Sequence, residues 1–248
     1  MADTLVHEPL AHWARTRAHV VAIDDGQSAL TFAELFDQVQ TQANALTAQN
    51  SPATVFVDDQ LTTLEQLVSF LAIITSGRCA AVSDPDWPSS VRTSVQSAFS
   101  TSAATVSEPS PQTPFYIGFT SGSTGLPKGF RRHHQSWTES LRVCMDTFGA
   151  DAASCVLAPG RFSHSLFLFG MMLGLWSGAG VVVQARFSAA RMMDTLKQGR
   201  TPCLVAVPSQ LLLMLELATR RAMTPMPDVR LILISGARWM RDRTAALQ

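Results

Sequence analysis

The segment 118–130 (GFTSGSTGLPKGF) gathers the side chains of this chain that are best suited to hold an anion. Hydroxyls, glycines and one lysine fall within ten residues: Thr120, Ser121, Gly122, Ser123, Thr124, Gly125, Lys128 and Gly129. Glycine lets backbone N–H groups approach a ligand closely and adopts positive φ without steric cost. Hydroxyl and ammonium groups donate hydrogen bonds to phosphate oxygens. The spacing therefore predicts a phosphate-binding loop, in which Pro127 stiffens the chain before Lys128.

This segment differs from the P-loop of nucleotide hydrolases, which reads G-x-x-x-x-G-K-[ST]. Pro127 precedes Lys128 and Gly129 follows it, so the glycine before the lysine and the magnesium-binding hydroxyl after it are both missing. A flexible connection without a ligand is the other alternative. The position of the lysine, shortly after a buried strand, argues against it.

The elements around the segment alternate between apolar runs and amphipathic stretches. Thr31 and Glu34 form the pattern of a capping box, and apolar residues recur at helical spacing up to residue 46. Further helices are predicted over about 61–75, 89–99, 137–148, 164–176, 188–197 and 209–217, and strands over 54–57, 79–82, 115–119, 155–157, 181–183, 203–207 and 229–234. Such a pattern indicates an α/β fold of mostly parallel sheets covered by helices on both faces. Residues 120–129 then lie at the carboxyl end of a strand, before a helix, where ligands bind in such sheets.

The composition argues against several classes of protein. Basic and acidic residues both number 19, so no net charge favours nucleic acid or an anionic membrane. The uncharged run 166–183 is divided by glycines into a helix and a strand, which argues against a membrane span. The cysteines lack metal-type spacing and are expected to be free buried thiols: Cys79, Cys144, Cys155 and Cys203. No signal peptide is recognisable, and a cytoplasmic location is expected.

Residues 120–129 (TSGSTGLPKG) resemble, without a gap, the phosphate-loop signature of the AMP-forming acyl-CoA synthetase, adenylation-domain and luciferase superfamily. Residues 29–35 (ALTFAEL) resemble the LTYAEL helix of that family, and residues 72–88 resemble its AILKAGAAYVPLDPxYP stretch. His134 falls where the family usually has a histidine. Residues 161–164 resemble its FHxxG element at the acyl pocket, and residues 234–237 its GGAPL turn. The resemblance covers about 15–240 and implies the large N-terminal domain of such a ligase.

The resemblance implies a two-step ligase that uses ATP, Mg²⁺ and coenzyme A. A carboxylate attacks the α-phosphate of ATP to give an acyl-adenylate and pyrophosphate, and a thiol then takes the acyl group. The implied catalytic residues are Lys128 and Thr120. The implied nucleotide-binding residues are Thr120, Ser121, Gly122, Ser123, Thr124, Gly125, Lys128, Gly236 and Ala237, and the implied substrate residues are Phe162, His164 and Gly236. These groups would act by positioning and charge stabilisation.

The resemblance also bears on the carboxylate substrate. Amino-acid-activating members usually hold the ammonium group with an Asp in the pocket element, and residues 162–167 contain no carboxylate. An unpaired ammonium in a pocket is costly, which argues against an α-amino acid. Ser165 also departs from the His-Asn pair common in aryl acid ligases. The apolar residues that follow favour a fatty-type acyl group, although they could equally be plain core: Phe167, Phe169, Met171 and Met172.

Several candidate residues keep two interpretations. His164 could gate or line the acyl site, or it could be a helix cap or a core histidine. The cluster 131–134 (RRHH) could attract the phosphates of ATP or coenzyme A, or it could be a solvated helix start. Arg238, Arg241 and Arg243 are expected to be surface charges.

The length of the chain sets a further expectation. At 248 residues it lacks matches to the later YGxTE segment, the ribose-binding Asp and the lysine-bearing C-terminal lid domain of the family. We expect a first α/β subdomain over 1–160 that carries the loop, and a partial second one over 161–248. Such an N-terminal part should be inactive alone and should self-associate or need a missing C-terminal half, because uncovered sheet edges associate. The alternatives are a non-catalytic remnant that binds phosphate, acyl groups or a partner chain, and an unrelated nucleotide-binding α/β domain.

Overall fold

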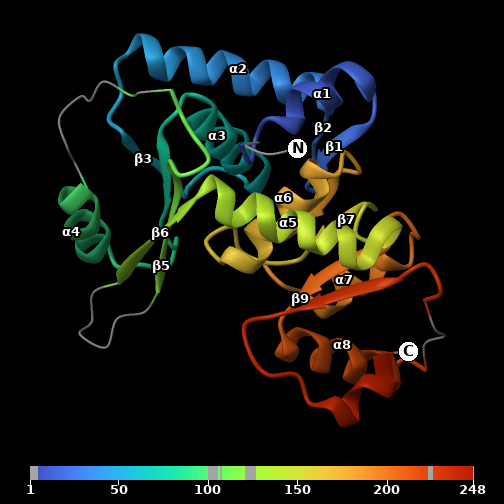
Figure 1. The fold of residues 1–248 in the computed structure, drawn as a ribbon. Helices are drawn as coiled ribbons and strands as arrows, with labels where there is room; N and C mark the ends of the chain where they lie inside the picture. The colour runs from blue at the N-terminus through green and yellow to red at the C-terminus, as the bar shows by residue number, and fades with distance from the viewer. Residues whose placement is uncertain (1–4, 100–105, 107, 121–126, 223–225, 248) are drawn as a thin grey trace.

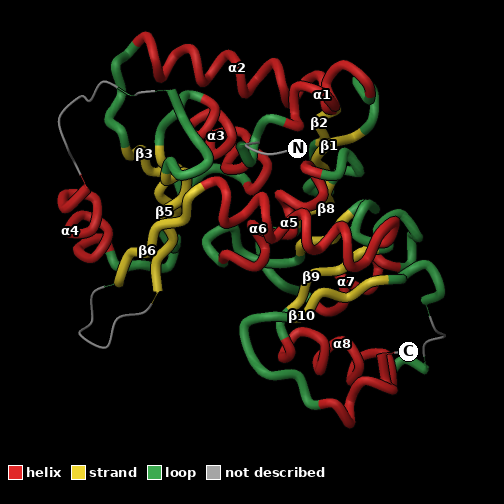
Figure 2. Tube along the Cα trace, in the orientation of Figure 1, coloured by secondary structure: helices red, strands yellow, loops and turns green. Residues whose placement is uncertain are grey.

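Two β-sheets and the helices packed on them make up the fold (Figure 1). The computed structural model describes residues 5–99, 106, 108–120, 127–222 and 226–247. Sheet A has the strand order β10-β9-β7-β8-β1-β2 and sheet B the order β3-β4-β5-β6. Figure 2 shows the two groups of strands on either side of α5 and α6. The expected α/β class with mostly parallel sheets is confirmed.

The strands and helices have the following bounds. Sheet A consists of β1 (Val21–Asp24), β2 (Ala29–Thr31), β7 (Val156–Ala158), β8 (Val181–Val183), β9 (Cys203–Ala206) and β10 (Leu231–Ile234). Sheet B consists of β3 (Thr54–Val57), β4 (Cys79–Val82), β5 (Pro114–Thr120) and β6 (Lys128–His133). The helices are α1 (Pro9–Thr16), α2 (Phe32–Ala48), α3 (Thr63–Thr75), α4 (Ser89–Phe99), α5 (His134–Phe148), α6 (Ser165–Trp176), α7 (Ala189–Leu196) and α8 (Pro208–Arg220), with the 3-10 turns η1 (Gly149–Asp151) and η2 (Arg241–Leu247).

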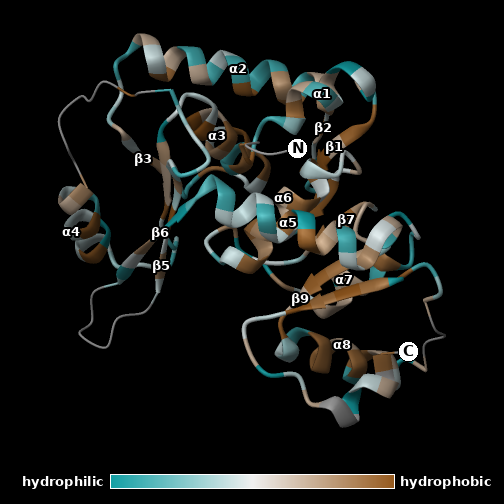
Figure 3. Cartoon of the chain, viewed as in Figure 1, coloured by the Kyte–Doolittle hydropathy of each residue, from teal (hydrophilic) through white to brown (hydrophobic). Residues whose placement is uncertain are grey.

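The central strands of sheet A are apolar throughout because both of their faces are buried. Val156 and Val205 belong to the main core, against which α6 packs, whereas Leu157 and Leu204 belong to a second cluster with residues of α7 and α8. Every residue of β7, β8 and β9 is buried. Figure 3 shows the hydrophobic colour along β9 and the mixed colouring of α2 and α5. This burial is the reason why the sequence predicts these strands so closely.

The helix starts follow local hydrogen-bond chemistry. At the start of α2, Thr31 and Glu34 form the predicted capping box, with each side chain bonded to the backbone N–H of the other residue. Thr62 and Glu65 form a second capping box at α3. Gly77, which follows α3, has φ +78°, a conformation that favours glycine and ends the helix.

The N-terminal segment completes sheet A. β1 pairs in parallel with β8 and antiparallel with β2, and neither strand nor α1 was predicted from the sequence. Sheet A thus combines strands from 21–31 with strands from 156–234. Sheet A therefore contains strands from both sides of residue 160. The subdomain boundary that we expect at that residue stays a prediction.

β6 is the main departure from the sequence-based prediction. Residues 128–133 pair antiparallel with β5 along its length. The sequence predicted no strand there: it placed the loop before a helix over 137–148 and gave a solvated helix start as one interpretation of 131–134. β6 is an edge strand whose side chains are mostly exposed and charged, so it lacks the apolar run that marks the other strands. α5 begins at His134, after the hairpin.

The uncharged run 166–183 divides as predicted into α6 and β8. In the described part of the chain, no helix combines the length and the apolar character that crossing a membrane requires.

Candidate functional site

The ends of the predicted phosphate loop meet where β5 ends and β6 begins. Thr120 and Lys128 are register partners, and the Thr120 hydroxyl donates to the Lys128 carbonyl oxygen at 3.4 Å. Both residues are exposed, as is Gly129. The predicted loop residues between them lie outside the described residues: Ser121, Gly122, Ser123, Thr124 and Gly125. The two strands therefore bring Thr120 and Lys128 together at one exposed end of the hairpin.

β6, and not a helix, begins at Lys128, and the helix that follows begins at His134.

A cleft of about 470 Å³ lies between the two sheets. Sheet B and α5 form one side through Tyr116, Phe130, Arg132, Trp137, Ser140 and Cys144. The start of α6 and the ends of β9 and β10 form the other through His164, Ser165, Leu166, Phe169, Val207, Leu233, Ile234, Ser235 and Gly236. The carboxyl end of β10 thus reaches the cleft, as expected for ligand sites in parallel sheets.

Two of the three predicted substrate residues, His164 and Gly236, line this cleft together. His164 occupies the N-cap position of α6, but its side chain makes no capping hydrogen bond and is exposed. Gly236 has φ +84°, and a Cβ there would lie 3.1 Å from Val207 Cγ1, so the turn after β10 favours glycine. Ala237 follows it and is exposed, outside the residues that line the cleft.

Phe162 lies elsewhere. It is buried, packs against Phe70 with ring centroids 5.8 Å apart, and lines a second pocket of about 180 Å³. That pocket lies near the carboxyl ends of β3, β4 and β8. Phe162 and His164, which belong to the same short loop, therefore line two different cavities.

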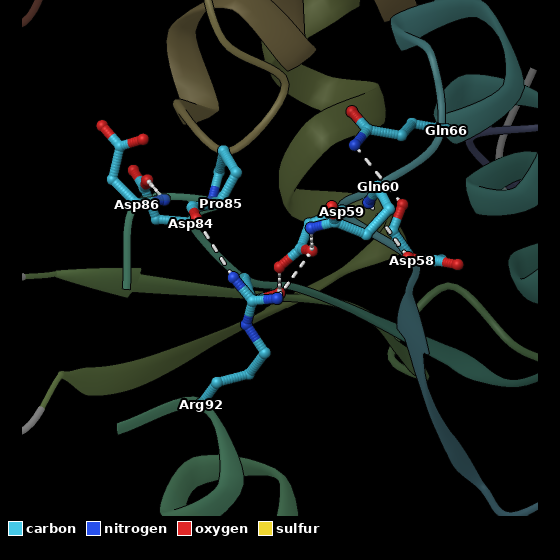
Figure 4. A network of polar contacts seen from close by, with 9 residues as sticks. Asp58, Asp59, Gln60, Gln66, Asp84, Pro85, Asp86 and Arg92 are labelled. Carbon is cyan, nitrogen blue, oxygen red and sulfur yellow. Dashed lines mark hydrogen bonds and ion pairs between the residues drawn. The ribbon is translucent and has the colours of Figure 1, made fainter. Parts of the chain in front are cut away.

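Charged residues beside the second pocket pair with one another. Figure 4 shows Arg92 reaching between Asp59 and Pro85; it donates to the Asp59 carboxylate at 3.0 Å and to the Pro85 carbonyl at 3.1 Å. Arg161 bonds Asp84 at 3.1 Å and also contacts Asp86. The hydrogen bond with Asp86 and the two carboxylates raise the pKa of Arg161. The Arg161 contacts fix the 84–88 turn against the loop after β7.

The basic cluster 131–134 is split by the structure. Arg131 and Arg132 are exposed on β6, and His133 caps α5 by accepting the Ser136 N–H at 3.2 Å. His134 is buried, so the solvated helix start that the sequence allowed is wrong for this residue. Its Nδ1 accepts the backbone N–H of Val6 at 3.2 Å, which ties the N-terminal segment to α5.

The four cysteines are free thiols, as predicted. Burial raises the pKa of Cys79 to about 12 and that of Cys155 to about 11, which keeps both thiols protonated at neutral pH. In the described residues no group of His, Cys, Asp and Glu is arranged to hold a metal ion.

Comparison with known proteins matches residues 90–247 to the family model of AMP-binding enzymes. The chain belongs to the AMP-binding enzyme family. The match includes the hairpin, α5, the start of α6 and β10, which together border the cleft. The resemblance drawn from residues 120–129 is thereby confirmed.

Two curated relatives carry acyl-CoA ligase names. The uncharacterized acyl–CoA ligase YhfT of Bacillus subtilis is 38% identical over 129 residues, which are 52% of this chain and 26% of YhfT. The putative long chain fatty acid-CoA ligase VraA of Staphylococcus aureus is 36% identical over 83 residues, which are 34% of this chain and 18% of VraA. The chain thus matches about a quarter or less of the length of these relatives.

Solved structures of adenylate-forming enzymes share the fold. The o-succinylbenzoate CoA synthetase of Bacillus subtilis matches 99% of this chain and 56% of its own, with a TM-score of 0.80 and 18% identity. The nonribosomal peptide synthetase FmoA3 matches 99% of this chain and 30% of its own, with a TM-score of 0.84 and 21% identity. At these identities the likeness concerns the fold alone.

Proposed function

We propose that this chain forms the nucleotide- and acid-binding part of an AMP-forming acid–thiol ligase. The observation that carries the proposal is the family match over residues 90–247, which contains both the Thr120–Lys128 hairpin and most of the cleft. The acyl-CoA ligase names of YhfT and VraA support the same class of reaction.

In the proposed reaction a carboxylate oxygen attacks the α-phosphorus of ATP. The new bond is an acyl phosphate anhydride, and the bond between the α-phosphorus and the bridging oxygen breaks, so that pyrophosphate leaves with the electron pair. The thiol of coenzyme A then attacks the acyl carbon and AMP leaves.

Lys128 would neutralise charge on the β- and γ-phosphate oxygens, and Thr120 would donate its hydroxyl to them. The backbone N–H groups of 121–125 would complete the cradle. Gly236 and Ala237 would contact the nucleotide. The resemblance implies Mg²⁺ as well, but the described residues offer no ligand cluster for it, and we assign it no step.

The acid would bind in the cleft, with His164 and Gly236 at its edge. Apolar side chains from three elements favour an acyl group with a large apolar part: Trp137, Leu166, Phe169 and Leu233. The fatty acid name of VraA supports this choice. Phe162, which the sequence placed at the acyl site, would act by supporting the loop that carries His164.

The test compares two lysine variants, because the sequence contains two lysines, Lys128 and Lys197. Lys128→Ala should weaken ATP binding about 10- to 100-fold, the cost of one charge-assisted contact, while AMP binding changes little because AMP lacks the β- and γ-phosphates. Lys197→Ala, an exposed change at the end of α7, is the matched control.

Calorimetric titration measures both nucleotides, and acid-dependent ATP–pyrophosphate exchange measures the first half-reaction. Equal ATP affinities for the two variants would refute the assignment of Lys128. Because we expect this part to be inactive alone, the absence of exchange would agree with that expectation, and exchange driven by a fatty, aryl or dicarboxylic acid would overturn it.

A further inference from the structure

The inner wall of the cleft is one face of the β5–β6 hairpin. Tyr116 pairs with Arg132 and Gly118 pairs with Phe130 in the antiparallel register. Residues two apart along a strand point to the same face, so all four share a face. Tyr116, Phe130 and Arg132 line the cleft on this face.

The Tyr116 hydroxyl has no hydrogen-bond partner in the described part of the structure. The side chain is completely buried, among the rings of Phe70, Phe130 and Trp137. Burial also raises the pKa of this phenol, which keeps it a neutral donor. A buried hydroxyl without a partner is destabilising, so its position calls for an explanation.

The glycine beside Tyr116 keeps the space for its hydroxyl. A Cβ on Gly118 would lie 2.4 Å from Tyr116 Oη and 2.4 Å from Phe130 Cζ. The hydroxyl thus lies close to the Gly118 backbone, and Tyr116 is one of the residues that line the cleft.

Arg132 provides the positive charge at the same wall. Its side chain is exposed, and within the described residues that side chain makes no ion pair or hydrogen bond. The described lining of the cleft contains neither Asp nor Glu. A guanidinium group with free donors next to an unpaired hydroxyl forms a site for an anionic oxygen group.

We propose that Arg132 and Tyr116 recognise a second carboxylate at the far end of the acyl substrate, so that the cleft selects dicarboxylic acids with an apolar middle. This inference rests on the proposed function. The guanidinium pairs with the distal carboxylate, and the phenol donates one further hydrogen bond to it. The reacting carboxylate lies toward the Thr120–Lys128 end of the hairpin. Four residues separate the two pairs along each strand, about 14 Å at ~3.4 Å per residue.

Calorimetric titration of the protein with monocarboxylic and α,ω-dicarboxylic acids of equal carbon number tests the proposal. The unmodified protein should bind the dicarboxylic acid more tightly. Arg132→Met should lower the affinity for the dicarboxylic acid about 10- to 100-fold, as expected for a charge-assisted pair, and leave the monocarboxylic acid unchanged. Tyr116→Phe should lower the same affinity about tenfold without lowering the Tm, because the hydroxyl has no partner in the free protein.

Arg131→Met is the matched control, because Arg131 pairs with Ile117 and belongs to the opposite face of the hairpin, near Cys79. It removes the same charge from the adjacent position and should not affect either acid. Circular dichroism and Tm verify that each variant is folded.

Equal binding of both acids by the unmodified protein, or equal effects of Arg132→Met and Arg131→Met, would overturn the proposal. ATP titration of Lys128→Ala and Lys197→Ala separates this failure from a failure of the proposed function. A loss of ATP affinity in Lys128→Ala only, with equal binding of both acids, contradicts the dicarboxylate site and leaves the ligase assignment standing. Dicarboxylate binding that depends on Arg132, with equal ATP affinities of the two lysine variants, supports the site and contradicts the ligase assignment.

Discussion

Acidification should destabilise this protein through two histidines that join the N-terminal segment to α5. The His134 ring is 1% exposed and stacks on Phe115 at 4.8 Å between ring centroids. The His7 ring contacts it edge-on at 5.7 Å, and His7 Nδ1 is buried without a partner in the described residues. Burial lowers the pKa of His7 to about 4. Burial, followed by repulsion from His7 and His133, lowers the pKa of His134 to about 3.

The direction of the effect follows from proton binding. Both pKa values lie below the ordinary value of 6.5, so the unfolded chain takes up protons at a higher pH than the folded protein does. The contribution to stability is complete above pH 6.5 and is lost as the pH falls from 6.5 toward 4. Each histidine contributes about 1.4 kcal/mol per pH unit well inside this window.

Because the His7 ring keeps some solvent contact, His7 should contribute less than His134 to the loss of stability on acidification. Between pH 6.5 and about 5 we expect the free energy of unfolding to fall by about 2–3 kcal/mol for the pair. That is a large part of the 5–15 kcal/mol typical of a folded domain. Asp and Glu titrate mainly below this range, so the histidines should dominate it.

Urea unfolding at several pH values between 5 and 7 measures this loss. His7→Phe keeps a ring at the position and removes one titrating group, so the loss should shrink to that of His134 alone. His19→Gln, at an exposed position, is the control and should keep the full dependence. The reasoning is refuted if His7→Phe loses as much stability on acidification as the unmodified protein.

Three further outcomes follow from the packing. Gly118→Ala should destabilise the protein by about 1–3 kcal/mol, measured by urea unfolding, because its Cβ would overlap Phe130 and Tyr116; an unchanged midpoint would contradict the packing described. Gly170→Ala should also destabilise it, because its Cβ would lie 2.6 Å from Val205 Cγ2, and this overlap outweighs the gain of about 1 kcal/mol in helix propensity; Val205→Ala in the same chain should recover part of the loss. Among the described strands, β10 pairs with β9 alone and consists of four apolar residues, so light scattering should detect self-association that grows with concentration, and a constant monomer mass would count against it.

Short apolar strands and helices with strong caps were predictable from the sequence. β3, β4 and β8 have the predicted bounds, since an apolar run between turn residues has few other stable arrangements in a chain of this kind. α2 begins after Thr31, because the capping box with Glu34 is encoded within four residues.

Contacts between distant residues were not predictable from local pattern. Arg161 and Asp84 are 77 residues apart, and their pairing depends on how the two sheets approach each other. His134 looks like part of a solvated basic cluster in the sequence, and it becomes buried because residues 5–10 pack over it. Phe162 and His164 differ in role because one precedes the helix in the core and the other lies at its exposed N-cap.

The edge strand β6 links the two halves of the proposed site. Antiparallel pairing with β5 brings Lys128 beside Thr120 at one end and Arg132 beside Tyr116 at the other. A helix start at 131–134, one of the two interpretations that the sequence left open, would have broken the second pair and left Arg132 without a place in the cleft. Lys128 and Arg132 make this strand hard to recognise from the sequence pattern because they are charged. They are also the residues that the proposed site requires there. One hairpin would then set both the position of the phosphates and the distance to the distal carboxylate, so a change in its register should alter nucleotide binding and acid selectivity together.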